Sequence, residues 1–187
     1  MKRKRQQAPG DLERVREFVN TFDLEQDTDE LASPAELAAW MRERELAPSR
    51  LRPTRRDLAE AIELREALRA ILLAHNGGEP PPAGASAVVD GAARRARLRL
   101  RFDEDGGATL VPEAGGIDGA LGRLLTIVHG AITQGTWERL KACREHSCEW
   151  AFYDHTKNRS GAWCTMQVCG NRAKARAYRS RRAVAAA

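Results

Sequence analysis

The sequence predicts an α+β fold that is mainly α. A helical N-terminal domain with a β-hairpin is followed by a small four-cysteine module that ends in a basic helix. Apolar residues recur at helical spacing in several segments before position 135, one segment alternates apolar residues with arginine, and all four cysteines lie between 143 and 169. With 187 residues, 42% of them hydrophobic, the chain can form one core and a small module.

Three helices are expected in the first half of the chain. The first covers 11–20, where apolar residues share one face. The second opens at 33–36, SPAE, which has the form of a capping box with proline at the first helical position, and runs to about 44. The third runs from about Thr54 to Asn76, and its long apolar stripe is the strongest helix signal in the sequence.

Beyond the third helix the pattern changes. The sequence EPPPAGA at 79–85 predicts a loop because it contains three prolines. Apolar residues and arginines alternate strictly over 97–102, as in a strand with one face in water. A turn at 103–107 and a return strand at 109–111 complete a hairpin. A further amphipathic helix is expected over 117–134.

The charge is unevenly distributed. The formal net charge is +5, but 139–182 holds 11 basic and 3 acidic residues, so that segment carries +8 and the remainder −3. Such a one-sided positive field attracts polyanions. We expect a basic arm at 1–10, a helical domain at 11–136, a cysteine module at 137–182 and a tail at 183–187.

Several classes of protein are excluded by the pattern of apolar residues. No stretch approaches the roughly 20 apolar residues of a membrane span. The basic start of the sequence is not followed by the apolar segment of a secretory signal. We therefore expect a cytoplasmic protein without a membrane partner, in which the cysteines are reduced or bound to metal.

The cysteines form two close pairs, each with four residues between its members, separated by 15 residues. They are Cys143, Cys148, Cys164 and Cys169. This arrangement predicts a tetrahedral structural zinc site with no coordination position left for water. Two disulfides, a thiol redox switch, or His146 or His155 in place of one cysteine remain as alternatives. Since the module is too short to fold on its own core, metal would supply folding free energy.

The residues after the last cysteine predict a basic helix without an acidic residue. Its expected nucleic-acid contacts are Arg172, Lys174, Arg176 and Arg179. A helix this basic repels itself unless it faces an anion, and a phosphate backbone is the obvious partner. The alternative is a solvated basic tail.

The segment from 137 to 182 resembles the CGNR zinc finger, which takes its name from the tetrapeptide found here at 169–172. The paired cysteines, the segment Phe-Tyr-Asp at 152–154 and the Trp-Cys pair at 163–164 occur in order. The preceding body is similar to the ABATE domain, through FVNT at 18–21, SPAEL at 33–37 and LREAL at 64–68.

The resemblance implies a cytoplasmic bacterial protein that regulates transcription under stress, with the four cysteines as zinc ligands and the finger as its DNA-binding element. The family tends to have basic residues before the Trp-Cys pair. This chain has Gly161 and Ala162 there, which removes positive charge from that loop.

The leading hypothesis is a zinc-finger transcription regulator that binds DNA through the basic helix, with the body sensing a signal or mediating assembly, for instance as a homodimer. One alternative is a zinc-stapled protein-interaction module that docks on the transcription machinery. Another is a regulator with affinity for RNA or DNA whose body binds a small-molecule effector near Asn20, Thr21 and Arg65. An enzyme is not expected, since the sequence has no phosphate-binding glycine loop, nucleophile motif or open metal site.

Overall fold

A computed structural model of the chain describes residues 7–47, 50–77 and 80–185. The helices are α1 (Leu12–Val19), α2 (Pro34–Glu43), α3 (Arg55–His75), α4 (Ala83–Arg95), α5 (Gly116–Thr133) and α6 (Asn171–Ala185). The strands pair as three antiparallel hairpins, β1 (Phe22–Asp23) with β2 (Thr28–Asp29), β3 (Leu98–Phe102) with β4 (Ala108–Pro112), and β5 (Leu140–Ala142) with β6 (Ala151–Tyr153). The α+β, mainly α class is confirmed. No helix in the described ranges is long and apolar enough to cross a membrane.

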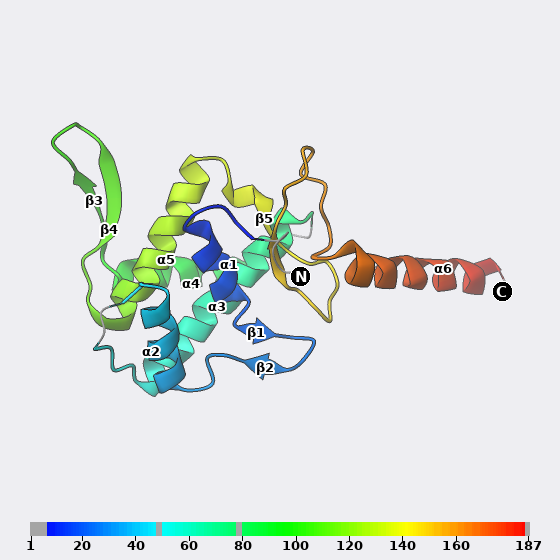
Figure 1. Cartoon of the computed structure of the whole chain (residues 1–187), viewed down its shortest axis with the longest axis horizontal. Coiled ribbons are helices and arrows are strands. Elements are labelled where there is room, and N and C mark those ends of the chain that lie inside the picture. Colours follow the sequence, from blue (N-terminus) through cyan, green and yellow to red (C-terminus); the bar gives the residue numbers. More distant parts are fainter. Residues whose placement is uncertain (1–6, 48–49, 78–79, 186–187) are drawn as a thin grey trace.

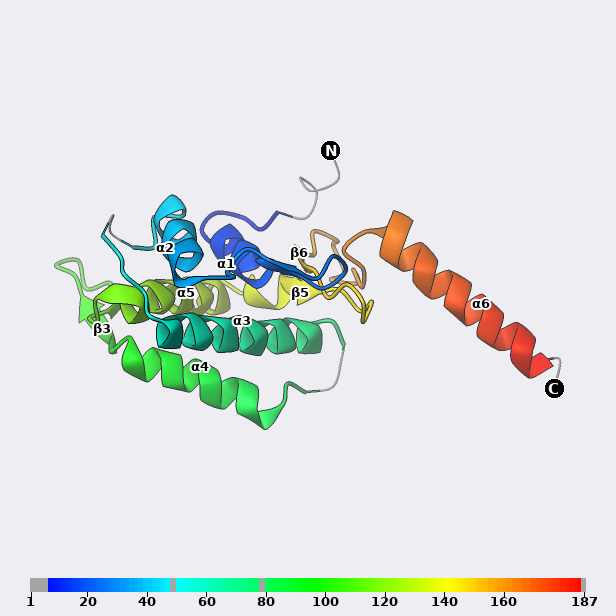
Figure 2. The same ribbon diagram turned by 90° about the horizontal axis from the view of Figure 1, so that it is seen from below.

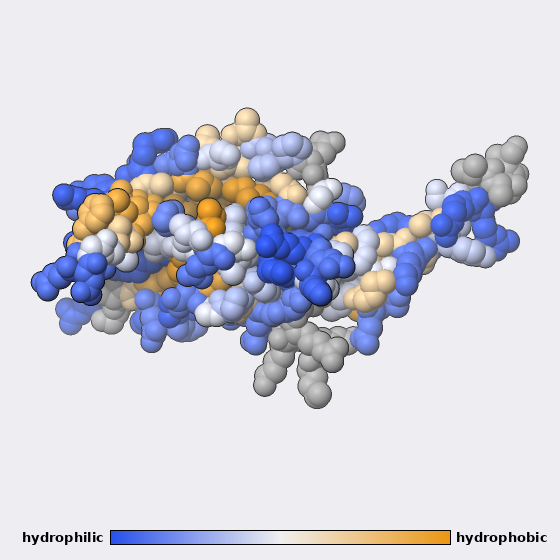
Figure 3. All heavy atoms as spheres, turned by 90° about the horizontal axis from the view of Figure 1, so that it is seen from above, coloured by the Kyte–Doolittle hydropathy of each residue, from blue (hydrophilic) through white to orange (hydrophobic). Residues whose placement is uncertain are grey.

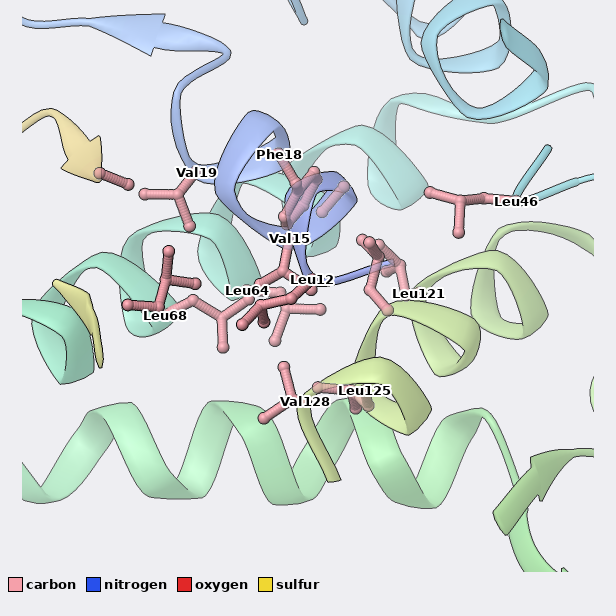
Figure 4. Close-up of a cluster of buried hydrophobic side chains, with 14 of the residues drawn as sticks. Leu12, Val15, Phe18, Val19, Leu46, Leu64, Leu68, Leu121, Leu125 and Val128 are labelled. Carbon is pink, nitrogen blue, oxygen red and sulfur yellow. The ribbon is translucent and has the colours of Figure 1, made fainter. Parts of the chain in front are cut away.

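The core lies where α1, α3 and α5 meet. Side chains from these helices point toward one another, among them Phe18 of α1, Leu68 of α3 and Leu125 of α5 (Figure 4). Each of these three side chains is buried. Burying such a side chain stabilises the fold by about 1.5–3 kcal/mol, so the predicted apolar stripes account for the assembly of these helices.

The starts of α2 and α3 follow from their first residues. The side chain of Thr54 accepts a hydrogen bond from the backbone N–H of Asp57, and the Asp57 carboxylate accepts one from the backbone N–H of Thr54. Ser33 accepts a hydrogen bond from the backbone N–H of Glu36 at the start of α2, where Pro34 holds the first helical position. Each cap satisfies backbone donors that the helix leaves unpaired, so both predicted starts are confirmed.

The prediction of a loop over 79–85 is wrong in its last part, because α4 begins at Ala83. Proline is tolerated ahead of the first turn, so Pro82 precedes the helix without breaking it. The residues that follow are rich in alanine, which favours helix, but the buried ones are only Ala85 and Ala92. Without large apolar residues at helical spacing, α4 gave no periodic signal. It lies along α3 (Figure 2).

The predicted hairpin is present as β3 and β4, and it projects away from the helices (Figure 1). Its apolar face is covered only near the base, where Leu98 packs against the core. Toward the turn, Leu100 is 50% exposed and Phe102 69% exposed. Apolar residues gather at this end of the molecule, opposite α6 (Figure 3). The strand therefore has two solvent-accessible faces instead of the single one expected.

The C-terminal part is joined to the body through β5 and β6. These strands contact α3 and α1, and their buried residues Leu140, Ala142 and Ala151 belong to the same core cluster as the helices. By contrast, α6 extends away from the rest of the molecule (Figures 1 and 2). The predicted basic helix is thus attached at its N-terminal end and surrounded by solvent along most of its length.

Candidate metal centre and basic helix

The sulfur atoms of the four cysteines lie within 4.8 Å of one another. The Sγ atom of Cys164 is 3.7 Å from that of Cys148 and 3.6 Å from that of Cys169. A disulfide bond would require about 2.05 Å. A tetrahedron with zinc–sulfur bonds of about 2.3 Å has sulfur–sulfur edges of about 3.8 Å. The spacing and the chemistry of these donors therefore fit a closed structural zinc site.

Local backbone hydrogen bonds bring the two cysteine pairs together. Cys143 follows β5, and its N–H donates to the carbonyl of Trp150 at the start of the return strand. The N–H of Arg144 donates to the carbonyl of Ala162, which places the second pair beside the first. Cys169 lies in the turn at Met166–Gly170 that leads into α6. The cluster is thus set between the β5–β6 hairpin and the start of α6.

Three aromatic residues of this region pack against the cysteines. Phe152 is buried, and Trp150 and Trp163 are partly buried against the cysteine cluster. They cover part of the sulfur cluster, in which Cys143, Cys148 and Cys169 are buried and Cys164 is partly exposed. His146, the alternative ligand nearest in sequence, is exposed, and the metal-ligating cluster among the described residues consists of the four cysteines.

The thiols influence one another's ionisation. Hydrogen bonds from Cys148 and Cys164 lower the pKa of Cys143 to about 2. The hydrogen bond with Cys143 raises the pKa of Cys148 to about 12, and Cys143 and Cys148 together raise the pKa of Cys164. One thiolate forms readily, while each further negative charge is opposed by the first. A divalent cation relieves that repulsion, which is why such a cluster suits zinc.

A buried ion pair fixes the loop between the cysteine pairs. The ammonium group of Lys141 donates to the Asp154 carboxylate at 2.8 Å and to the carbonyl of Gly161 at 3.2 Å. Burial alone would raise the pKa of Asp154, but hydrogen bonds from Lys141, Thr156 and Gly161 outweigh it and lower the pKa to about 2. Asp154 belongs to the motif quoted for the finger, whereas Lys141 was not predicted to have a role.

The residues predicted for an effector pocket bind protein atoms in the structure. The Asn20 amide donates to the carbonyl of Ala151 at 2.9 Å and accepts from its N–H at 2.7 Å. Thr21 donates to the carbonyl of Phe18, and Arg65 lies 2.7 Å from Asp29 and pairs with Glu66. None of the three lines the cavity of about 850 Å³ between β4 and α5. An effector site at these residues stays a prediction.

Arg69 of α3 and Asn76, which caps the C-terminal end of that helix, also join the body to the cysteine module, and neither was predicted to do so. Arg69 donates to the carbonyls of Val19 and Glu149, at 2.7 and 3.1 Å. The Asn76 amide donates to the carbonyls of Ala142 and Ala162. Arg69 follows Arg65 by one helical turn, so two arginines on the buried side of one helix were the available signal.

The four basic residues predicted to contact nucleic acid divide into two pairs. Arg176 donates to both carboxylate oxygens of Glu145, at 3.0 and 2.7 Å, and Arg172 donates to Glu25 at 2.5 Å. In the described part of the chain, no ion pair joins Lys174 or Arg179 to a carboxylate, and both are exposed. Lys174 and Arg179 can therefore contact a partner without first breaking an ion pair within the chain.

Comparison with known families covers most of the chain. Residues 13–134 match the model of the ABATE family, described as "Putative stress-induced transcription regulator", and residues 139–182 match that of the CGNR zinc finger. No curated protein matches the chain. The resemblance to both families seen in the sequence is confirmed, and neither description is that of an enzyme.

Proposed function

Because this chain belongs to the ABATE family and carries a CGNR zinc finger, we propose that it is a transcription regulator that binds DNA through α6. The observation that carries the proposal is the charge, position and exposure of this helix. It has no acidic residue, it starts directly after the four-cysteine site, and it extends into solvent (Figure 1). An α-helix fits the major groove, and Lys and Arg side chains neutralise phosphates.

In this proposal zinc has a structural role. Cys143, Cys148, Cys164 and Cys169 are its ligands, and the ion holds the turn from which α6 starts. Replacing Cys164 by serine is expected to reduce the zinc content from one ion per chain, measured by metal analysis of the purified protein. Replacing the exposed Ser147 by alanine, between the first two cysteines, is the control and should leave the zinc content unchanged.

DNA binding is tested by titrating duplex DNA with the protein at several salt concentrations. Affinity should fall steeply as salt rises. Log K falls as log salt rises, and the double variant Lys174→Ala/Arg179→Ala should reduce the steepness of this fall by about 2, one unit for each lost phosphate contact. The control is Arg55→Ala/Arg56→Ala, which removes two exposed charges from the start of α3.

Three results would contradict the proposal that the chain binds DNA through α6. Binding that depends neither on salt nor on Lys174 and Arg179 would leave no role for α6. Absence of binding to any nucleic acid, with co-purification of an acidic protein, would favour the protein-interaction module. Stronger binding to duplex RNA of the same sequence would identify RNA as the partner.

For the body, the apolar hairpin face favours self-assembly. Cross-strand pairing places Leu110 beside Leu100 and Ala108 beside Phe102, so these side chains share one face. Leu110 and Ala108 also line the cavity of about 850 Å³, whose opposite wall is α5. From 124 to 137 the chain has no Lys, Arg, Asp or Glu, although 30% of its residues are charged.

A second copy of the chain is the proposed occupant of this cavity. The projecting hairpin and the hollow lie on the same side of the molecule, so a two-fold arrangement can place each hairpin in the hollow of the other copy. The apolar face of the hairpin carries no charge, and the lining of the hollow holds one acidic residue, Asp11, so contact between these two surfaces would desolvate few ions. A small effector in the cavity would still leave Phe102 exposed.

The oligomeric state tests this assembly. Light scattering should give twice the 20.7 kDa of one chain. Phe102→Ser should weaken the dimer at least tenfold, whereas Arg101→Ser, on the other face of the same strand, should not. A wild-type chain that is monomeric at every concentration, or a Phe102→Ser dimer of unchanged affinity, would contradict the proposal.

A further inference from the structure

The two carboxylates that bind α6 differ in burial and in geometry. Glu145 is 4% exposed at its side chain, and both of its oxygens accept hydrogen bonds from Arg176. Glu25 lies in the turn between β1 and β2, is 43% exposed, and accepts one hydrogen bond from Arg172. Both carboxylates neutralise an arginine of the same helix, but only Glu145 is buried.

Glu145 also shapes the cysteine turn. It lies between Cys143 and Cys148, and its backbone carbonyl accepts the N–H groups of Cys148 and Glu149. The backbone of this residue therefore sets the turn that holds two sulfur atoms, while its side chain binds α6 one turn after the helix starts. The direction of α6 is thereby tied to the conformation of the metal site.

The two ion pairs should respond differently to an incoming phosphate. Releasing Arg176 would leave a buried carboxylate without its partner, which is costly. Releasing Arg172 exposes a carboxylate that water can solvate, and surface pairs of this kind contribute little stability. A phosphate can therefore replace Glu25 but not Glu145.

We propose that Glu145 is a positioning residue that orients α6 through Arg176, and that Glu25 competes with nucleic-acid phosphate for Arg172. The inference rests on the proposed DNA binding. It assigns Arg176 to the support of the helix, and it adds Arg172 to the contacts of Lys174 and Arg179 only when Glu25 is displaced.

Opposite effects of two similar substitutions test this assignment. If charge alone mattered, removing either carboxylate would strengthen binding to DNA. We expect Glu25→Ala to tighten binding about 3- to 10-fold and to raise the salt slope by about 0.9, because Arg172 becomes available. We expect Glu145→Ala to weaken binding at least tenfold while the chain keeps one zinc ion.

The matched control is Glu43→Ala in α2, which removes an exposed carboxylate that also pairs with an arginine. Its affinity should stay within twofold of the wild type. Glu145→Gln keeps the side-chain volume and one acceptor oxygen, so its affinity should lie between those of wild type and Glu145→Ala. This graded series separates loss of orientation from loss of folding, since all variants are compared at equal zinc content.

A measurement without DNA separates the inference from the proposed function. In NMR relaxation of the zinc-bound full chain, the backbone of α6 should become less ordered in Glu145→Ala and stay unchanged in Glu25→Ala. Failure of the wild type to bind DNA would reject the function alone. Unchanged order of α6 in Glu145→Ala, or binding as tight as in the wild type, would overturn the positioning role, and equal affinities of Glu25→Ala and Glu43→Ala would overturn the competition.

Discussion

At the scale of single residues, a few buried polar side chains join the finger to the body. Asn20 binds both backbone groups of Ala151, and Arg69 and Asn76 donate to carbonyls of the cysteine module. Buried backbone groups need such partners, because an unpaired one costs about 1–3 kcal/mol. These side chains therefore determine the position and orientation of the finger relative to the body.

Replacing Asn20 by alanine leaves the N–H and the carbonyl of Ala151 without their partner. We expect the free energy of unfolding in urea to fall by about 2–4 kcal/mol, since two hydrogen bonds are lost in a buried site. Asn171→Ala, which removes an exposed amide bonded to the carbonyl of Gln167, should cost much less. Equal losses in the two variants would contradict this role of Asn20.

The pair of Lys141 and Asp154 makes stability depend on pH. The pKa of Asp154 is lowered to about 2 from the ordinary value of 3.8. The folded state therefore favours the ionised carboxylate, and its stabilisation is complete above pH 4 and is lost as the pH falls toward 2. By linkage, this stabilisation is about 2 kcal/mol.

Asp154→Asn should therefore be less stable than the wild type at pH 7, because Lys141 stays buried without a counter-charge. The difference in the free energy of unfolding should be constant above about pH 4 and shrink at lower pH. Urea unfolding of both proteins over the range from about pH 2 to 7 measures this difference in the free energy of unfolding. The contribution of the metal site is the same in both proteins, so it cancels in the comparison. A difference that grows toward low pH would contradict the assignment.

At the scale of elements, close approach of backbones sets the position of the β3–β4 hairpin. A Cβ atom on Gly122 of α5 would lie 2.7 Å from the Cβ of Ala96 and 2.8 Å from that of Pro112. These contacts are shorter than van der Waals contact, so only glycine lets the base of the hairpin rest on the helix. Gly130 of the same helix has no neighbour within 4 Å of such an atom.

The two glycines of α5 should respond in opposite directions to alanine. Gly122→Ala should lower the free energy of unfolding by about 1–3 kcal/mol through steric strain. Gly130→Ala should raise it by up to about 1 kcal/mol, since alanine favours helix over glycine. Thermal unfolding of both variants measures the difference, and a stabilised Gly122→Ala would show that the hairpin base can shift without cost.

At the scale of the whole molecule, the finger and the body share one hydrophobic core. The buried residues of β5 and β6 belong to the cluster formed by α1, α3 and α5. The expected division at 136 and 137 stays a prediction, and it falls at a point where packing is continuous. Residues 1–6 of the expected basic arm at 1–10, and residues 186–187 of the expected tail, lie outside the described residues.

Removal of zinc should therefore destabilise the whole chain and not the finger alone. We expect the melting temperature of chelated protein to fall, with circular dichroism of the helices and fluorescence of the tryptophans changing in one transition. Trp40 in the body and Trp163 beside the cysteines report on the two parts. Two separate transitions, with the helices melting at an unchanged temperature, would contradict the shared core.

The sequence alone determined the elements whose signals are local. Periodic apolar residues and caps identified α1, α2, α3 and α5, alternation identified the β3–β4 hairpin, and the spacing of the cysteines indicated the metal site. The helix α4 was missed, because its small residues carry no apolar stripe.

Only the tertiary structure decided which partner each polar side chain has. Asn20 binds Ala151, which is 131 positions away, and Arg172 binds Glu25, which is 147 positions away. Such pairs leave no periodic pattern, since they form only after packing brings distant segments together. For this reason the sequence located the basic helix, while the fold determined that two of its arginines bind carboxylates of the chain and that Lys174 and Arg179 remain open to solvent.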